Sequence, residues 1–171
     1  MTGTVIWNIR IRLIHWAMAV IILLSLFVFD DGETVHQWLG YGALLFLFIR
    51  LIIGFFGSGY EAFKNFELKP ARLIEFLKDH LRLKIGKNYL GHNPAASWSY
   101  IFFWLCVVGL GVTGVLLVHV DAYFGDERIE QIHELLSHFV QFFIVLHLSG
   151  LLLDSYIHKH RAWMAMITGK K

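Results

Sequence analysis

The sequence is poor in cysteine and in charged residues. Its 171 residues include a single cysteine, Cys106, which excludes a disulfide scaffold and any iron–sulfur cluster with several cysteine ligands. Charged residues make up 16% of the chain, against about 25% in an ordinary globular domain. The net charge is only +2, and no long basic run interrupts the apolar stretches. We therefore expect neither a water-soluble domain nor a protein that binds nucleic acid.

Hydrophobic residues, in contrast, make up 57% of the chain. They gather in four segments that each approach the roughly 20 residues needed to cross a membrane, at about 11–29, 36–56, 98–118 and 131–157. The first segment is not a typical signal peptide, because it is followed by the acidic Asp30-Asp31-Gly32-Glu33 and not by a small-residue cleavage site. We expect an all-α membrane protein, with residues 1–171 forming one bundle of four transmembrane helices.

The basic residues predict the orientation of the bundle. The N-terminus, the connection 57–97 and the C-terminal tail hold 2, 7 and 4 Lys and Arg residues, whereas the two opposite loops hold only Arg128. Because Lys and Arg favour the cytoplasmic side, both termini are expected in the cytoplasm. No lipidation or retention signal is visible, which favours a multi-pass protein of the bacterial inner membrane. The opposite loops carry seven carboxylates: Asp30, Asp31, Glu33, Asp121, Asp126, Glu127 and Glu130.

The long connection between the second and third segments contains an amphipathic stretch. From Pro70 to about Lys84, five apolar residues recur at helical spacing, Leu73, Ile74, Phe76, Leu77 and Leu81. This pattern predicts a short helix that lies on the cytoplasmic interface and contacts membrane lipid. A solvated loop is the alternative.

Four of the ten histidines are expected at membrane depth, where ionisable groups usually have a function. His133 and His147 are fourteen residues apart, so on a helix they lie roughly 21 Å apart along the axis and only about 40° apart around it. His138 lies about 140° from His133 and therefore off that face. By position in their segments, His36 lies level with His133, and His15 lies level with His147.

Two histidine pairs from different helices suit two iron centres with two imidazole ligands each. A haem needs axial ligands from opposite sides, which facing helices of a bundle provide. Because the chain lacks C-x-x-C-H, the haem would be non-covalent, that is, b-type. Imidazole ligands also suit zinc or copper, but a zinc site needs three or four ligands close together. A structural role is the alternative for any single histidine.

One arginine is also expected within the membrane. Arg50 lies fourteen residues after His36, so it shares the helix face of His36 and reaches the depth of the His15–His147 pair. It could bind the propionates of the haem there. Alternatively, its long side chain could extend to the membrane interface.

Several short motifs resemble one known family. They are Arg12-Leu13-Ile14-His15-Trp16, His36 with Gly40 and Arg50, Gly91-His92-Asn93-Pro94, and Ile132-His133-Glu134-Leu135 with His147. Together they resemble the bacterial di-haem cytochrome b561 type, especially the cytochrome b subunit of nickel–iron hydrogenases, over essentially the whole chain. The resemblance implies two b haems whose iron ligands are His15, His36, His133 and His147. It also implies electron transfer in the membrane, usually between quinones and a partner redox protein.

Our leading hypothesis is a cytochrome that transfers electrons across the inner membrane, between the quinone pool or cytoplasmic side and a periplasmic redox partner. That partner would be a hydrogenase-like subunit or, since the short chain is similar to stand-alone relatives, a soluble c-type cytochrome. A quinol or superoxide oxidoreductase acting by itself at the inner haem is the alternative. A non-redox anchor or transporter would require unligated histidines. Because Glu134 and Asp154 look like isolated carboxylates, an electron-transfer subunit is favoured over a complete enzyme.

Overall fold

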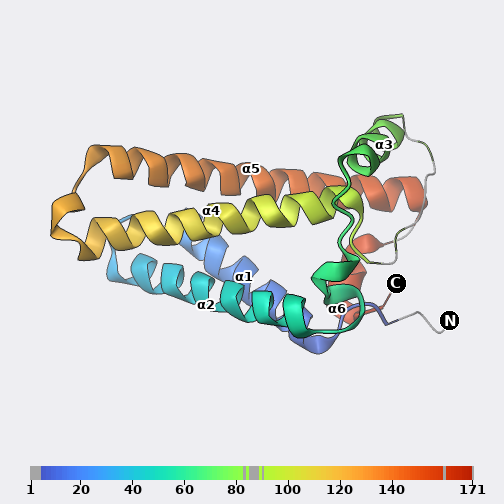
Figure 1. Ribbon diagram of the computed structural model, residues 1–171, viewed down its shortest axis with the longest axis horizontal. Helices are drawn as coiled ribbons and strands as arrows, with labels where there is room; N and C mark the ends of the chain where they lie inside the picture. Colours follow the sequence, from blue (N-terminus) through green and yellow to red (C-terminus); the bar gives the residue numbers. More distant parts are fainter. Residues whose placement is uncertain (1–4, 83, 85–88, 90, 160, 171) are drawn as a thin grey trace.

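The computed structural model describes residues 5–82, 84, 89, 91–159 and 161–170. Four of its helices are long and apolar enough to cross a membrane, and each runs antiparallel to the next (Figure 1). They are α1 (Ile9–Phe27), α2 (Thr34–Phe56), α4 (Pro94–His119) and α5 (Glu127–His158). The predicted all-α membrane bundle is therefore confirmed.

Helix caps explain why two helices begin earlier than predicted. α4 begins at Pro94 and not at 98, because the Asn93 side chain accepts a hydrogen bond from the Ala96 amide at 2.7 Å and proline suits the first helical position. α5 begins at Glu127 and not at 131, because Asp126 caps it by accepting two backbone amides. Both first turns are partly polar, so a search for apolar stretches misses them.

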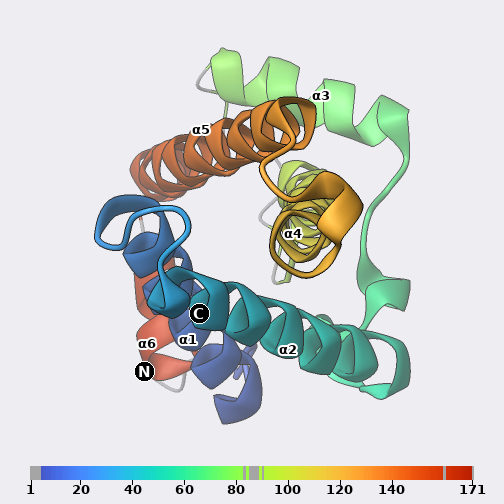
Figure 2. The same ribbon diagram turned by 90° about the vertical axis from the view of Figure 1, so that its left-hand side faces the viewer.

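The four helices surround a narrow apolar core. α4 packs along α5 and also against α2, while α1 packs along α2, and Figure 2 shows this arrangement from one end. Glycines allow α4 to approach its neighbours, since a Cβ at Gly109 would lie 2.7 Å from Leu136 of α5, and one at Gly111 would lie 2.6 Å from Leu44 of α2. The buried core residues are Ile22, Ala43, Leu47, Cys106, Val107 and Val140.

The two ends of the bundle differ. In the part of the chain that the structure describes, one end, here called the terminal end, holds the isolated bridge between Val5 and Lys170, α3 (Pro70–Leu81), α6 (Ala165–Thr168) and three short 3₁₀ helices. These 3₁₀ helices are η1 (Gly59–Glu61), η2 (Phe63–Asn65) and η4 (Ala162–Met164). The other end, here called the loop end, holds only the two connections 28–33 and 120–126, the second of which contains η3 (Asp121–Tyr123).

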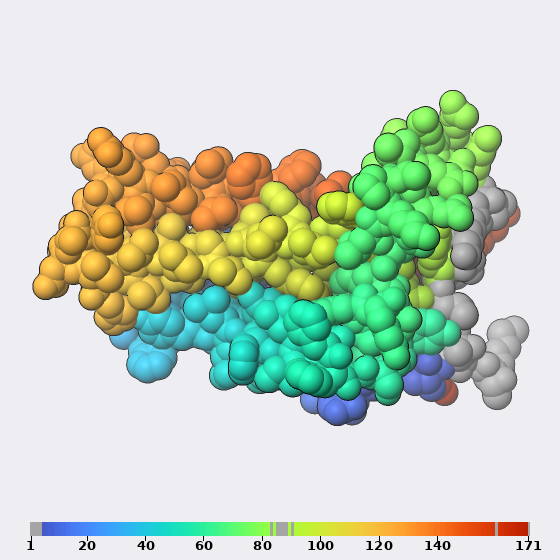
Figure 3. Space-filling model, in the orientation of Figure 1, coloured from blue at the N-terminus to red at the C-terminus, as the bar shows by residue number. Residues whose placement is uncertain are grey.

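The amphipathic stretch forms α3 (Pro70–Leu81), as the spacing predicts. α3 crosses the terminal end beside α4 and α5 and stands out from the side of the bundle (Figure 3). His80 is buried, whereas Ile74, Leu77 and Leu81 are exposed. The helix thus anchors one face on the bundle and leaves an apolar stripe on the outside.

Candidate functional site

The structure brings together the same two histidine pairs that the sequence predicts. At the loop end, the rings of His36 on α2 and His133 on α5 are 6.3 Å apart between centroids. Nearer the terminal end, the rings of His15 on α1 and His147 on α5 are 6.2 Å apart. We call these the loop-end pair and the terminal-end pair. α5 contributes one imidazole to each.

The spacing within each pair fits one metal ion between two imidazoles. Each metal–nitrogen bond to histidine is about 2 Å long and the nitrogen lies about 1 Å from its ring centre, so two rings on opposite sides of a metal have centres roughly 6 Å apart. Among the described residues, no group of three or more His, Cys, Asp or Glu side chains could hold a metal ion. A centre with two protein ligands suits a planar cofactor that supplies the remaining ligands itself, which is the case for haem.

Glycines lie beside both pairs. Gly40 follows His36 by one helical turn, and Gly150 follows His147 by three residues, so each lies close to the face that carries the histidine. A Cβ at either glycine would meet no atom within 4 Å. The backbone surface next to both pairs is therefore open enough for a flat, bulky group.

A threonine orients the loop-end pair. The Thr113 hydroxyl on α4 lies 2.9 Å from the Gly109 carbonyl oxygen, to which it donates, and 2.7 Å from Nδ1 of His133. Because the hydroxyl can donate its one hydrogen to the carbonyl oxygen of Gly109 or of Leu110, its oxygen can accept from the Nδ1–H of His133. This tautomer leaves the Nε2 lone pair of His133 available for a metal ion.

The partner imidazole has weaker polar contacts. Nδ1 of His36 lies 3.4 Å from both the Ser25 hydroxyl and the Phe29 carbonyl oxygen. Its Nε2 lies 3.5 Å from the carboxylate of Asp31, a side chain that is 86% exposed. An exposed loop carboxylate can move away at little cost, so Nε2 of His36 can also serve a metal ion.

The terminal-end pair is held by aromatic contacts. The His15 ring packs edge-on against Trp16, with centroids 5.4 Å apart. The His147 ring stacks on Phe143, with an interplanar angle of 15°. Aromatic contacts of this kind fix the ring planes without occupying their nitrogen atoms.

Arg50 lies in an aromatic box at the terminal end. Its guanidinium carbon is 5.2 Å from the ring centroid of Phe63, 6.0 Å from that of Tyr100 and 5.6 Å from that of Trp104. One guanidinium nitrogen donates to the Glu61 carbonyl oxygen at 3.1 Å. The side chain is only 5% exposed, so it does not extend to the surface. That Arg50 binds a haem propionate stays a prediction.

Asp154 is not isolated, contrary to the interpretation from sequence. Its carboxylate oxygen lies 3.2 Å from Nδ1 of His158 and 3.8 Å from Nε2 of His80, and the two imidazoles have centroids 6.2 Å apart. The sequence did carry a signal for part of this cluster, because His158 follows Asp154 by four residues and therefore lies beside it on a helix. The contribution of α3 through His80 could not be foreseen, since it depends on tertiary packing.

A bundle of four membrane-spanning helices with facing imidazoles at two depths is the architecture of a membrane cytochrome of the b type. Residues 6–169 match the family model of prokaryotic cytochrome b561. Comparisons with curated proteins and with solved structures found no match. The chain therefore belongs to the prokaryotic cytochrome b561 family, as its motifs indicate. It is a multi-pass bacterial membrane protein of electron transfer that binds haem b.

Proposed function

We propose that the protein holds two b haems and carries electrons across the membrane between them. His36 and His133 bind the loop-end haem, and His15 and His147 bind the terminal-end haem. The observation that carries this proposal is the nearly equal spacing of the two pairs, 6.3 and 6.2 Å, at two positions on α5. Each bound haem supplies a one-electron iron couple.

The residues around the haems position and insulate them. Two histidines on each iron leave no coordination position for oxygen or a substrate, which favours electron transfer over catalysis at the metal. α5 separates its two histidines by roughly 21 Å along the helix axis, so the two irons would stand at different depths of the bilayer. The apolar core between the two irons, with Val140 fully buried, excludes water from the region through which the electron passes.

The orientation follows from charge. With its excess of Lys and Arg, the terminal end faces the cytoplasm, and the loop end faces the periplasm. α3 then lies at the cytoplasmic interface, with Ile74, Leu77 and Leu81 exposed to lipid. Electrons exchange with the quinone pool or the cytoplasmic side at the terminal end and with a periplasmic protein at the loop end.

The periplasmic partner is a basic redox protein of the c-type cytochrome class. The acidic loops flank the loop-end pair, and the exposed Asp31 lies 3.5 Å from His36 itself. A negative surface over an electron exit attracts a positive partner, and salt weakens this attraction over a Debye length of about 8 Å at physiological ionic strength. The rate of electron exchange with a basic c-type cytochrome should therefore fall across a salt series. A variant with Asp121→Asn and Glu127→Gln should show a slower rate and a flatter salt dependence, and salt-independent rates would argue against this partner.

Transmembrane transfer is tested with the purified protein in liposomes that contain ferricyanide. An impermeant external reductant should reduce the entrapped ferricyanide only when both haems are present. His36→Ala should abolish this reduction, whereas His138→Ala, which removes an exposed histidine of the same helix as His133, should retain it. Reduction no faster than in empty liposomes would contradict the proposal.

A further inference from the structure

Three titratable side chains from two helices meet at the terminal end. Asp154 lies near the end of α5, between His158 of the same helix at 3.2 Å and His80 of α3 at 3.8 Å. His80 is 8% exposed, although it belongs to a helix whose other side faces outward. An imidazole–carboxylate–imidazole group of this kind can hold one proton more or less at a modest cost in free energy, because each member can share the charge of its neighbours.

The cluster lies in line with the proposed iron ligands. Successive steps of seven residues along α5 lead from His133 through Val140 and His147 to Asp154, so all four lie near one helix face. Asp154 is thus about 10 Å beyond His147 along the axis. In the low dielectric of the bundle, a change of one charge at Asp154 therefore alters the electrostatic potential at the proposed iron site beside His147.

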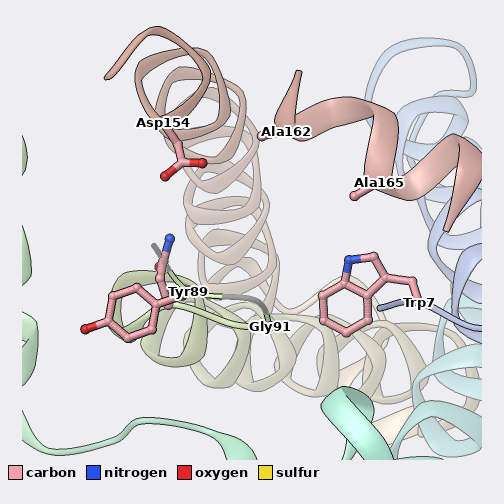
Figure 4. A pocket seen from close by; sticks show the side chains of 7 residues that line it. Trp7, Tyr89, Gly91, Asp154, Ala162 and Ala165 are labelled. Atoms are coloured by element: carbon pink, nitrogen blue, oxygen red, sulfur yellow. The ribbon is translucent and has the colours of Figure 1, made fainter. Parts of the chain in front are cut away.

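The cluster also borders a cavity. Asp154 reaches from α5 into a cavity of about 130 Å³, across from Trp7 and Tyr89 (Figure 4). This volume is large enough for several water molecules. The titratable side chains that face Asp154 include His158 of α5, His80 of α3 and Tyr89 of the segment before α4.

We propose that the His80–Asp154–His158 cluster takes up a proton when the terminal-end haem is reduced, and releases it when that haem is oxidised. This inference rests on the proposed function, since it needs a haem between His15 and His147. A haem held by His15 and His147 would supply the one-electron couple, with its electron coming from the loop-end haem or from an added mediator. For each electron the cluster would gain one proton from the medium, relayed through the cavity. The charge of this region is then unchanged, and no bond to the iron forms or breaks.

Coupling between haem reduction and proton uptake makes the midpoint potential of the haem depend on pH. A purely structural contact between α3 and α5 would not do so. The midpoint potential of the terminal-end haem must fall as the pH rises, by up to about 59 mV for each tenfold change in proton concentration for one proton per electron. The loop-end haem lies roughly 21 Å further along α5 from His147, so its potential should depend on pH much less.

The test is an optical redox titration of the purified holoprotein at several pH values between about 6 and 8. In the wild-type protein, the midpoint potential of one haem should fall as the pH rises, while that of the other stays nearly constant. Asp154→Asn should flatten the slope of the first haem. His80→Gln, on a different helix, should reduce the same slope, and it keeps the inference testable if Asp154→Asn fails to fold. Glu75→Gln is the matched control, because it removes an exposed carboxylate of α3 outside the cluster and should change nothing.

Proton uptake measured with a pH indicator in weak buffer gives a second readout. Reduction of the protein should remove protons from the medium, and Asp154→Asn should lose most of this uptake while keeping both haems. An unchanged slope and unchanged uptake in folded variants with two haems would overturn the inference but leave the proposed function intact. Fewer than two haems in the unchanged protein would instead overturn the proposed function.

Discussion

The imidazole of His36 faces that of His133 with 6.3 Å between their centroids, and the Thr113 hydroxyl lies 2.7 Å from Nδ1 of the second ring. Three helices, α2, α4 and α5, thus cooperate in one centre. The terminal-end pair joins α1 to the same α5. α5 is therefore the common support of both centres, and changes on it should affect one haem or the other according to depth.

Loss of either histidine of a pair should remove the same haem. His36→Ala and His133→Ala should each lose the loop-end haem, whereas His15→Ala and His147→Ala should each lose the terminal-end haem, because an iron with one axial imidazole is held weakly. Haem content and the redox titration of each variant distinguish the two losses. His138→Ala should retain both haems. Loss of a haem in His138→Ala, together with its retention in His133→Ala, would show that the ligands are assigned wrongly.

Thr113→Val should raise the midpoint potential of the loop-end haem. The Thr113 oxygen accepts the Nδ1–H of His133, which makes the imidazole a stronger donor and favours the oxidised iron. Removal of this acceptor should also lower haem affinity, by about 10-fold to about 100-fold. Thr113→Ser retains the hydroxyl and serves as the control. Equal potentials in the valine and serine variants would mean that the contact has no part in tuning this haem.

Arg50→Leu should lower the midpoint potential of the terminal-end haem. Removal of a buried positive charge destabilises the reduced form, which is the more negative one, by a free energy on the order of 1 kcal/mol. Arg50→Lys keeps the charge but loses the planar contacts with Phe63, Tyr100 and Trp104, so it should affect stability more than potential. An equal shift of both haems, or no shift, would show that Arg50 acts only in packing.

Acid should destabilise the protein partly through His92. Burial, together with the nearby Arg50 charge, lowers the pKa of His92 from 6.5 to about 3. Between these values the unfolded chain binds a proton at His92 that the folded chain does not, so the free energy of unfolding falls as the pH falls. At about pH 5 the loss should be about 2 kcal/mol, since each pH unit below 6.5 costs about 1.4 kcal/mol. Thermal unfolding at several pH values should show a smaller acid effect in His92→Phe than in the unchanged protein.

The matched control for this prediction is His138→Phe, since His138 is an exposed histidine and the same kind of substitution is made there. A parallel pH dependence of Tm in His92→Phe and the unchanged protein would contradict the assignment to His92.

The sequence was sufficient for the features that depend on periodicity. Apolar length predicted the four spanning helices, and the spacing of His133 and His147 on one helix face predicted which histidines would meet. Features that depend on tertiary contacts were out of reach. His80 joins Asp154 only because α3 folds back onto α5, and Thr113 reaches His133 only because Gly109 lets α4 approach that helix closely. The polar first turns of α4 and α5 were missed because their Asn93 and Asp126 caps carry no apolar signal.

The central claim is that each histidine pair holds one b haem. The most direct test is a pyridine haemochrome spectrum of the purified protein, combined with a quantitative amino-acid analysis of the same sample. Our account predicts two haems for each chain, both extracted by acid–acetone because neither is covalently attached. A ratio of one haem per chain, or haem that resists extraction, would contradict it.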